Sequence, residues 1–203
     1  MGFAPWALGI GASLALMVAW PGLQAPAPEP LTYFVAAGKP ETSYRPSDRQ
    51  LAVWALEAWA RHSEGALRLE PADEARAAVR VYWVAASDGL YGEMRRQIVD
   101  GRPVADVYVR PDTRGLGPDI DALATRDPLV RETIVYLTCL HELGHALGLD
   151  HTDDYRDIMY AFGYGGDIPG YFMRYRKQLR SRGDIPSVAG LSASDIAHLR
   201  AVP

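Results

Sequence analysis

The sequence predicts a domain of the α+β or mixed α/β class. The elements expected along the chain come in the order strand, helix, several strands and then helices, which is typical of that class. The 203 residues are enough for one domain with a sizeable core, and 48% hydrophobic and 23% charged residues are ordinary for a globular fold. The formal net charge of −4 gives no electrostatic reason to expect a nucleic-acid partner.

The N-terminal segment differs from the rest of the chain in composition. No Asp, Glu, Lys or Arg precedes Glu29, and residues 6–20 are almost wholly apolar. We therefore expect residues 1–25 to be a signal peptide or an N-terminal membrane anchor, with the choice between the two open. Either reading predicts an exported protein, periplasmic or extracellular. Residues 26–30 are typical of an extended, Pro-rich linker, and the domain is expected to cover residues 31–203.

The first elements of the domain are predicted to be a strand and a helix. Residues 31–37 (LTYFVAA) have the β-branched and aromatic content of a strand. Residues 47–65 carry apolar side chains at helical spacing, with Ser47 placed as a cap and Gln50 three residues later in a capping-box arrangement. His62 falls in the last turn of this helix, where the helix dipole favours it, so we assign it a structural role.

The middle of the chain is predicted to form further strands. Residues 77–84 (AAVRVYWV) alternate between apolar and polar types, which indicates a strand. Residues 95–99 and 102–109 flank Asp100-Gly101, a pair that suits a two-residue hairpin turn. We therefore expect these two segments to pair as antiparallel strands.

A helix with a histidine motif follows. Residues 110–128 are dense in Gly, Pro and Asp and are predicted to form a loop. From residue 129 to residue 147 the apolar pattern is helical again. His141 and His145 lie in this helix, four residues apart, so their imidazoles point from the same face toward one point.

The sequence HELGHALGLDH, residues 141–151, has the residue types and the spacing of a metal site. Gly148 allows the helix to end in a left-handed turn, so that His151 can reach the same point as His141 and His145. Three neutral imidazoles suit Zn²⁺ and leave a fourth coordination position open, as catalytic zinc sites require. Glu142 is placed to act as general base on a bound water and then to pass the proton to a leaving amine. The residues alone thus predict a catalytic zinc site.

With this motif the chain resembles the metzincin zinc proteases, whose signature continues with a methionine-containing turn near the metal. Met159 in DIMY matches that methionine, and its expected role is to pack under the site. Astacin-like and serralysin-like metzincins have a tyrosine two residues later, whereas this chain has Ala161, so it is more similar to the matrixins. The resemblance extends loosely over residues 31–203. It implies a twisted, mostly parallel sheet with an antiparallel edge strand, an active-site helix, a Met-turn and a C-terminal helix.

The resemblance also implies a function, namely a zinc endopeptidase with one catalytic zinc, acting as a monomer on proteins or peptides. Residues 89–94 (GLYGEM) are the candidate edge strand for binding the substrate backbone, and residues 160–164 (YAFGY) would line the pocket for the side chain after the scissile bond. The final helix is predicted to start at Ser192, with Asp195 in the capping-box position. Two alternatives stay open: a zinc-binding or adhesion module without proteolysis, and a zinc hydrolase of a non-peptide amide.

The sequence departs from animal matrixins at its cysteine and its histidines. Cys139 is the only cysteine, and on a helix it points away from His141, so it is expected to be a core residue. Within this chain a cysteine switch is therefore excluded. A second, structural zinc needs three more histidines, and His62 and His198 are the two that remain. We accordingly predict one zinc.

Two further segments allow more than one interpretation. Calcium can bind aspartates such as Asp112, Asp119 and Asp121, but loop aspartates more often cap turns. Residues 173–182 (MRYRKQLRSR) form an insertion relative to the matrixin pattern, with five basic residues within nine positions. They are expected to form a solvated helix face, or else a basic lip over the cleft or a contact with anionic lipid.

Overall fold

A mostly parallel sheet organises the domain. The computed structural model describes residues 29–86, 91–162 and 165–202. Within these residues lies a five-stranded sheet of order β2-β1-β3-β5-β4, in which β4 is antiparallel to β5 and the other pairs are parallel. This confirms the expected mixed α/β class with an antiparallel edge strand. The strands are β1 (Leu31–Val35), β2 (Leu69–Pro71), β3 (Val79–Trp83), β4 (Gly92–Val99) and β5 (Arg102–Val109).

The predicted hairpin is confirmed, and its first strand is longer than expected. Asp100 and Gly101 both have positive φ angles, 50° and 75°, as a two-residue turn between twisted strands requires. β4 begins at Gly92 and so includes the second half of the candidate edge strand, residues 89–94. Residues 89 and 90 lie outside the described residues.

The central strands separate an apolar face from a polar one. Val81 and Val107, which are partners across β3 and β5, are fully buried in the core. The neighbouring partners Arg80 and Asp106 point to the other face, where Nε and Oδ1 lie 2.7 Å apart in a buried ion pair. Because side chains alternate along a strand, this pattern leaves one apolar face for the helices to cover.

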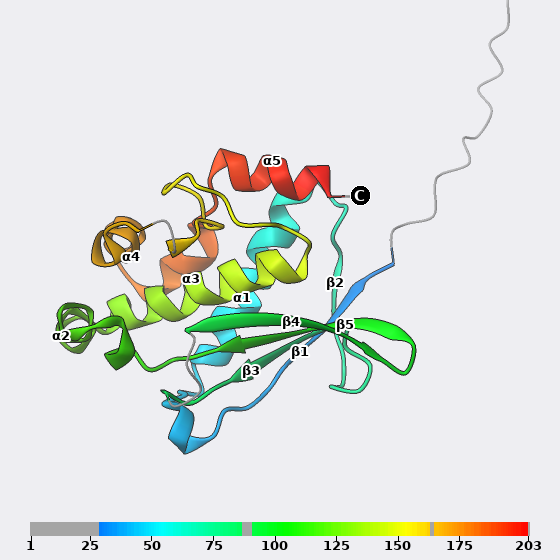
Figure 1. Ribbon diagram of the computed structural model, residues 1–203, viewed down its shortest axis with the longest axis horizontal. Helices are drawn as coiled ribbons and strands as arrows, with labels where there is room; N and C mark the ends of the chain where they lie inside the picture. The colour runs from blue at the N-terminus through cyan, green and yellow to red at the C-terminus, as the bar shows by residue number, and fades with distance from the viewer. Residues whose placement is uncertain (1–28, 87–90, 163–164, 203) are drawn as a thin grey trace, which may run out of the picture.

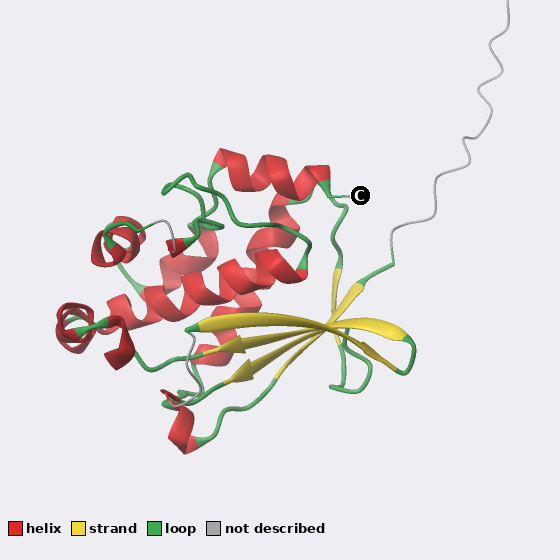
Figure 2. Ribbon diagram, in the orientation of Figure 1, coloured by secondary structure: helices red, strands yellow, loops and turns green. Residues whose placement is uncertain are grey.

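The two long helices, α1 (Asp48–His62) and α3 (Pro128–Ala146), lie together on the apolar face of the sheet (Figures 1 and 2). Trp59 of α1 is fully buried between them, and its indole N–H donates to the carbonyl of Leu140 in α3 at 2.9 Å. A buried aromatic side chain with its polar atom satisfied contributes strongly to the core. This packing holds α3, which carries the histidine motif, against the sheet.

The start of α1 differs from the prediction. Ser47 has helical backbone angles (φ −68°, ψ −20°) and its side chain makes no capping hydrogen bond, so the predicted capping box with Gln50 is wrong. The side chain of Asp48 stabilises the start of α1 instead. Its Oδ2 accepts the N–H of Arg45 at 2.8 Å, and its two oxygens accept from Arg131 of α3 at 2.7 and 2.8 Å. A partner 83 residues away determines this helix start, and local spacing carries no sign of it.

The segment predicted as a loop, residues 110–128, contains helical structure. A 3₁₀ turn, Arg114–Leu116, leads into α2 (Pro118–Arg126). Proline suits the first turn of a helix, and Asp119 and Asp121 there complement the helix dipole. The Gly and Pro residues that suggested a loop therefore mark the beginning of a short helix.

The C-terminal part of the described chain consists of α4 (Ile168–Arg176), a 3₁₀ segment (Arg182–Ser187) and α5 (Ala193–Ala201). The predicted cap of α5 is confirmed. The N–H of Asp195 donates to Ser192 Oγ at 2.9 Å, and the N–H of Ser192 donates to the Asp195 carboxylate at 2.8 Å. Both bonds of the capping box are therefore present.

The N-terminal expectations fall almost entirely outside the described part of the chain. Residues 1–28 lie outside it, so the signal peptide or anchor, and most of the linker, stay predictions. Among the described residues, no helix combines the length and the apolar character needed to cross a membrane.

Candidate active site

The helix α3 carries two of the predicted ligands on one face, His141 and His145. The Nδ1 of His141 lies 2.6 Å from the carbonyl oxygen of Ile158, and the Nδ1 of His145 lies 2.8 Å from that of Leu149. A carbonyl oxygen can only accept a hydrogen bond, so Nδ1 is the donor in each ring, and in the neutral form of such a ring Nε2 keeps a lone pair. Backbone outside the helix thus orients both rings with Nε2 free for a metal.

The helix ends at the glycine that the sequence singled out. Gly148 has a φ of 103°, and its N–H donates to the carbonyl of His145 at 3.0 Å. The N–H of Leu149 donates to the carbonyl of Gly144, also at 3.0 Å. Together these bonds form a Schellman motif, which satisfies the last carbonyls of a helix. The turn brings the Leu149 carbonyl to His145 and directs the chain back toward His151.

His151 approaches the same point from outside the helix. Its Nε2 lies 3.2 Å from the Nε2 of His141 and 3.1 Å from that of His145. Two nitrogens bound to one tetrahedral zinc ion lie about 3.3 Å apart, so the observed separations suit a shared ion. Burial lowers the pKa of His141 to about 4, which favours its neutral, metal-binding form. The structure thus brings the three predicted histidines together.

Glu142 faces the edge strand β4 from α3. Its side chain is 7% exposed, and burial, followed by the charge of Glu93, raises its pKa to about 7. Gly92 lies so close that a Cβ atom at this position would overlap the Glu142 carboxylate. The missing side chain at position 92 therefore makes room for this group between helix and strand. A carboxylate so placed is suited to receive and return a proton.

Met159 is fully buried behind the histidines and packs against Gly144 of α3, where a Cβ atom would overlap its sulfur. The C-terminal helix holds this turn in place. Asp195 accepts the N–H of Ile158 at 2.9 Å through Oδ2 and the N–H of Met159 at 3.3 Å through Oδ1. The residue predicted in the capping-box position of α5 thus also anchors the turn whose Ile158 carbonyl orients His141.

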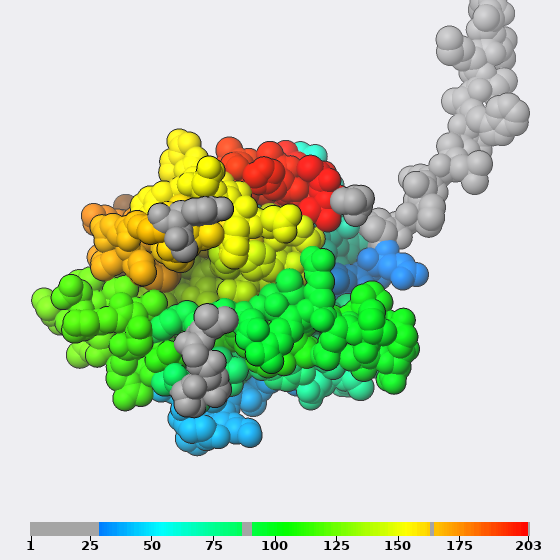
Figure 3. Space-filling view, in the orientation of Figure 1, coloured from blue at the N-terminus to red at the C-terminus, as the bar shows by residue number. Residues whose placement is uncertain are grey.

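A cleft of about 660 Å³ opens beside Glu142. The start of β4 forms one side, and the segment after the histidine motif forms the other; in Figure 3 these are the green surface below and the yellow surface above. Residues 160–162 of the predicted pocket segment line the cleft, whereas residues 163 and 164 lie outside the described residues. The lining is mainly apolar and includes Leu116, Leu137, Tyr160, Phe162, Ile168 and Phe172.

The family model described as matrixin matches residues 26–167, a span that includes the three histidines, Glu142 and Met159. This chain belongs to the matrixin family. Matrixins are zinc-dependent endopeptidases, so membership implies a bound zinc ion, and the histidine group could hold a metal ion.

This matrixin is also similar to macrophage metalloelastase of Oryctolagus cuniculus. The two are 32% identical over 92 residues, which cover 44% of this chain and 19% of that relative. The aligned stretch therefore covers about a fifth of the length of the curated relative.

Other residues considered from the sequence lie elsewhere in the matrixin domain. His62 directs Nδ1 to the carbonyl of Ala58 at 2.8 Å, which confirms a structural role at the end of α1. Cys139 is fully buried in the core, and burial raises the pKa of its thiol well above the usual value. It is therefore a packing residue, as expected. His198 lies on α5 and does not join the histidine group.

Two of the three aspartates considered for calcium bind protein groups. Asp112 forms ion pairs with Arg110 and Arg114, and Asp121 accepts from the hydroxyl of Thr113 at 3.1 Å. In the described ranges, the histidine group is the one set of three or more His, Cys, Asp or Glu side chains close enough to share an ion.

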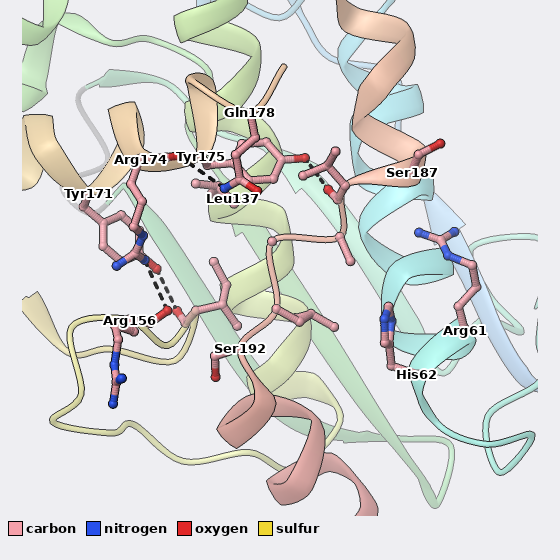
Figure 4. A pocket seen from close by; sticks show the side chains of 15 residues that line it. Arg61, His62, Leu137, Arg156, Tyr171, Arg174, Tyr175, Gln178, Ser187 and Ser192 are labelled. Atoms are coloured by element: carbon pink, nitrogen blue, oxygen red, sulfur yellow. Dashed lines mark hydrogen bonds between the residues drawn. The ribbon is translucent and has the colours of Figure 1, made fainter. Parts of the chain in front are cut away.

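The basic insertion is tied to the body of the matrixin domain. Arg174 donates to the carbonyl oxygens of Tyr155 at 2.8 Å and Arg156 at 3.2 Å, and its guanidinium lies over the ring of Tyr171 (Figure 4). An arginine held by two carbonyls and an aromatic face joins α4 to the segment between His151 and the Met-turn.

Two more basic residues of the insertion form ion pairs with α3 and its cap. Arg176 lies 2.7 Å from the carboxylate of Asp127, the N-cap of α3, and Arg182 lies 2.7 Å from that of Glu132. The insertion is thus neither a uniformly solvated face nor a free basic lip. Its arginines attach α4, which supplies part of the cleft wall.

Sequence reasoning missed the groups that support the site. Gly92, Gly144 and the second role of Asp195 each depend on a contact between segments far apart in the chain. The carbonyls of Ile158 and Leu149 that orient the histidines are main-chain groups, so they cannot be recognised from the residue types in the sequence. The glycine within HELGH was the one visible signal, since a glycine inside a helix often marks close packing.

Proposed function

We propose that this matrixin hydrolyses peptide bonds of proteins, with His141, His145 and His151 as zinc ligands and Glu142 as general base and then general acid. One observation carries the proposal. Three imidazole rings, two of them oriented by backbone carbonyls, converge on one point beside a buried carboxylate. Membership of the family supports the zinc-dependent endopeptidase class, and the geometry supports the role given to each residue.

The donor set suits zinc. Neutral imidazole nitrogens are common zinc ligands, and three of them leave a coordination position open for chemistry. A zinc ion bound here supplies Lewis acidity, which polarises a carbonyl group and lowers the pKa of a water molecule. The carbonyls of Ile158 and Leu149 support the ligands by keeping Nε2 unprotonated in His141 and His145.

Glu142 moves the proton during hydrolysis. Its carboxylate accepts a proton from the attacking water as the new bond to the carbonyl carbon forms. The same carboxyl group then gives that proton to the peptide nitrogen, so that the C–N bond breaks and an amine leaves. Burial beside Gly92 makes Glu142 a stronger base than an exposed carboxylate.

The substrate backbone is expected to bind along β4. Among the described residues this strand pairs with β5 alone, so its outer edge can accept an extended peptide as an added strand. The side chain after the scissile bond then enters the cleft next to Tyr160, Phe162 and Phe172. An apolar, aromatic lining favours a large apolar side chain at that position.

The substitution Glu142→Gln tests the mechanism. Glutamine has nearly the same shape but cannot accept a proton, so we expect kcat to fall by about two to four orders of magnitude while zinc stays bound. Cleavage of a fluorogenic peptide gives the rate, and elemental analysis of the purified protein gives the zinc content. Full activity in this variant would refute the assigned role.

A digest of casein, gelatin and a peptide library, with and without a chelator, separates the proposal from its alternatives. Cleavage that a chelator abolishes and added zinc restores supports the endopeptidase. Stoichiometric zinc without any cleavage indicates a binding or adhesion module, and hydrolysis confined to non-peptide amides indicates the other hydrolase. Sites of cleavage read by mass spectrometry also test the apolar preference after the scissile bond.

We further propose that residues 31–203 form the catalytic domain, that residues 26–30 are a linker, and that residues 1–25 direct export as a signal peptide or an anchor. The apolar composition of residues 6–20 supports export. The intact mass of the protein recovered from an exporting host distinguishes cleavage from anchoring.

A further inference from the structure

Every second residue of the edge strand β4 from Gly92 to Arg96 faces α3. Gly92 lies against Glu142, Met94 packs against the core, and Arg96 donates from Nη2 to the carbonyl oxygen of His145 at 3.1 Å. Because side chains alternate along a strand, these three share the face that borders the active site. Arg96 is thus the basic residue of β4 on the face that borders α3.

The other charged pair of β4, Glu93 and Arg95, is already neutralised by its own ion pair, and Glu93 also borders the cleft. Arg95 binds Glu93 through two N–O contacts of 2.8 and 2.7 Å, and its guanidinium lies over the ring of Tyr108. Arg96 has a different environment. It is exposed, and within the described residues no carboxylate forms an ion pair with it. Its positive charge therefore has no acidic partner in the described part of the domain.

The position of Arg96 relative to the cleft indicates which part of a substrate passes it. The cleft extends from Glu142 toward Leu137 and Thr138, earlier in α3. Arg96 lies in the other direction, at the C-terminal end of the same helix. If the cleft receives the residue after the scissile bond, the residues before the bond run along β4 toward Arg96. Four residues of strand from Gly92 to Arg96 span about 13 Å, which is three to four residues of extended substrate.

We propose that Arg96 is a specificity-determining residue that binds an acidic side chain at the third or fourth position before the scissile bond. This inference rests on the proposed peptidase function. An arginine keeps its charge at any physiological pH, and its five N–H donors allow one to hold the His145 carbonyl while others bind a carboxylate. The hydrogen bond to His145 keeps the guanidinium beside the path of the substrate.

A purely structural role for Arg96 makes a different prediction. Its contact with a carbonyl at the end of α3 also suits a cation that stabilises a helix C-terminus. Loss of such a role lowers stability or overall activity equally for every substrate. A ratio of two substrates measured on the same variant removes these common effects and reports charge recognition alone.

The experiment uses a peptide with a mapped cleavage site and places either Asp or Asn at the second, third, fourth or fifth position before the bond. The ratio of kcat/KM for Asp over Asn is measured for the zinc-loaded wild type and for Arg96→Gln, Arg96→Glu and Arg102→Gln. Arg102 is the matched control because it is also exposed and also donates to a backbone carbonyl, that of Ala75, at 3.0 Å.

We expect the wild type to favour Asp by about three- to fivefold at the third or fourth position, the size of one exposed ion pair, and less at high salt. The ratio should fall to one in Arg96→Gln, drop below one in Arg96→Glu and stay at the wild-type value in Arg102→Gln. Binding of the same peptides to Glu142→Gln, followed by fluorescence anisotropy, should show the same preference without turnover.

Two outcomes overturn the inference and are distinguishable from each other. Cleavage without an Asp preference, or a preference that survives Arg96→Gln, refutes the role of Arg96 and leaves the peptidase intact. If the zinc-loaded wild type cleaves none of the peptides, including the library, the proposed function fails and this inference fails with it.

Discussion

At the scale of single residues, the site depends on two glycines, because the lack of a side chain there leaves room for neighbouring groups. Gly92 leaves space for the Glu142 carboxylate, and Gly144 leaves space for the sulfur of Met159. Neither glycine has a positive φ angle, so neither is required by its backbone conformation. Close approach of a neighbouring group is the reason for glycine at both positions.

The substitution Gly92→Ala tests this close approach. The new methyl group displaces the Glu142 carboxylate, and a displacement of about 1 Å in a catalytic group costs about 100-fold in rate. We expect kcat/KM to fall by about that factor while zinc content and the melting temperature change little. Gly183→Ala is the matched control, because a Cβ atom there meets Ser181 Oγ at 3.4 Å, an ordinary contact far from the cleft. Equal activity of the two variants would contradict the argument.

At the scale of elements, the end of α3 does two tasks with one turn. The Schellman motif at Gly148 satisfies the helix carbonyls, and it also places the Leu149 carbonyl on His145 and returns the chain to His151. Because both tasks need the left-handed conformation, a change that strains this turn should affect stability and metal binding together.

The substitution Gly148→Ala, compared with Gly65→Ala, separates these two effects. Both glycines lie just after a helix and have positive φ, 103° and 86°, so each alanine should lower the free energy of unfolding by about 1 to 2 kcal/mol. Only Gly148→Ala should also weaken zinc binding, by about 10- to 100-fold, the usual effect of disturbing a group that orients a ligand. Urea unfolding and competition with a zinc-binding dye give the two quantities. Unchanged zinc affinity in Gly148→Ala would show that the turn does not orient the ligands.

The same elements show which parts of the fold and the site can be predicted from the sequence alone. α3, its glycine stop and the convergence of three histidines follow from spacing, because a helix and its cap are local structures. The beginning of α1 and the helix α2 were predicted incorrectly. At the beginning of α1, the Asp48 carboxylate accepts hydrogen bonds from Arg131 across the core. At α2, Gly and Pro begin a helix where a loop was expected. The contact of Asp195 with the Met-turn joins residues 37 apart, and no local pattern encodes it.

At the scale of the whole molecule, the site is assembled from segments that the fold brings together. The edge strand supplies Gly92, α3 supplies two histidines and Glu142, the Met-turn supplies a carbonyl, and α5 supplies Asp195. A metal ion held, as proposed, by α3 and by His151 beyond its end would bind the folded state and not the unfolded chain, and would so stabilise the whole domain.

Zinc removal at different pH values tests this link. At pH 7, zinc at about 100 times its Kd should raise the melting temperature by about 5 to 10 °C above that of the chelated protein. The pKa of His141 is lowered to about 4 by burial, below that of an unfolded histidine, so the unfolded chain takes up the proton first. The chelated protein should therefore lose stability as pH falls from about 6.5 to about 4. Calorimetry that shows no effect of zinc at pH 7 would contradict the metal site.

Tyr171 of α4 has a consequence for redesign of this enzyme. Its ring borders the cleft, while its hydroxyl donates to the Asp157 carbonyl at 3.0 Å and also lies 3.3 Å from the Ile158 carbonyl, the oxygen that holds His141. The side chain of Tyr171 therefore links the lining of the cleft to the carbonyl that orients His141. A substitution that reshapes the cavity at this position should also change how His141 is held, unless the replacement preserves a donor to that oxygen.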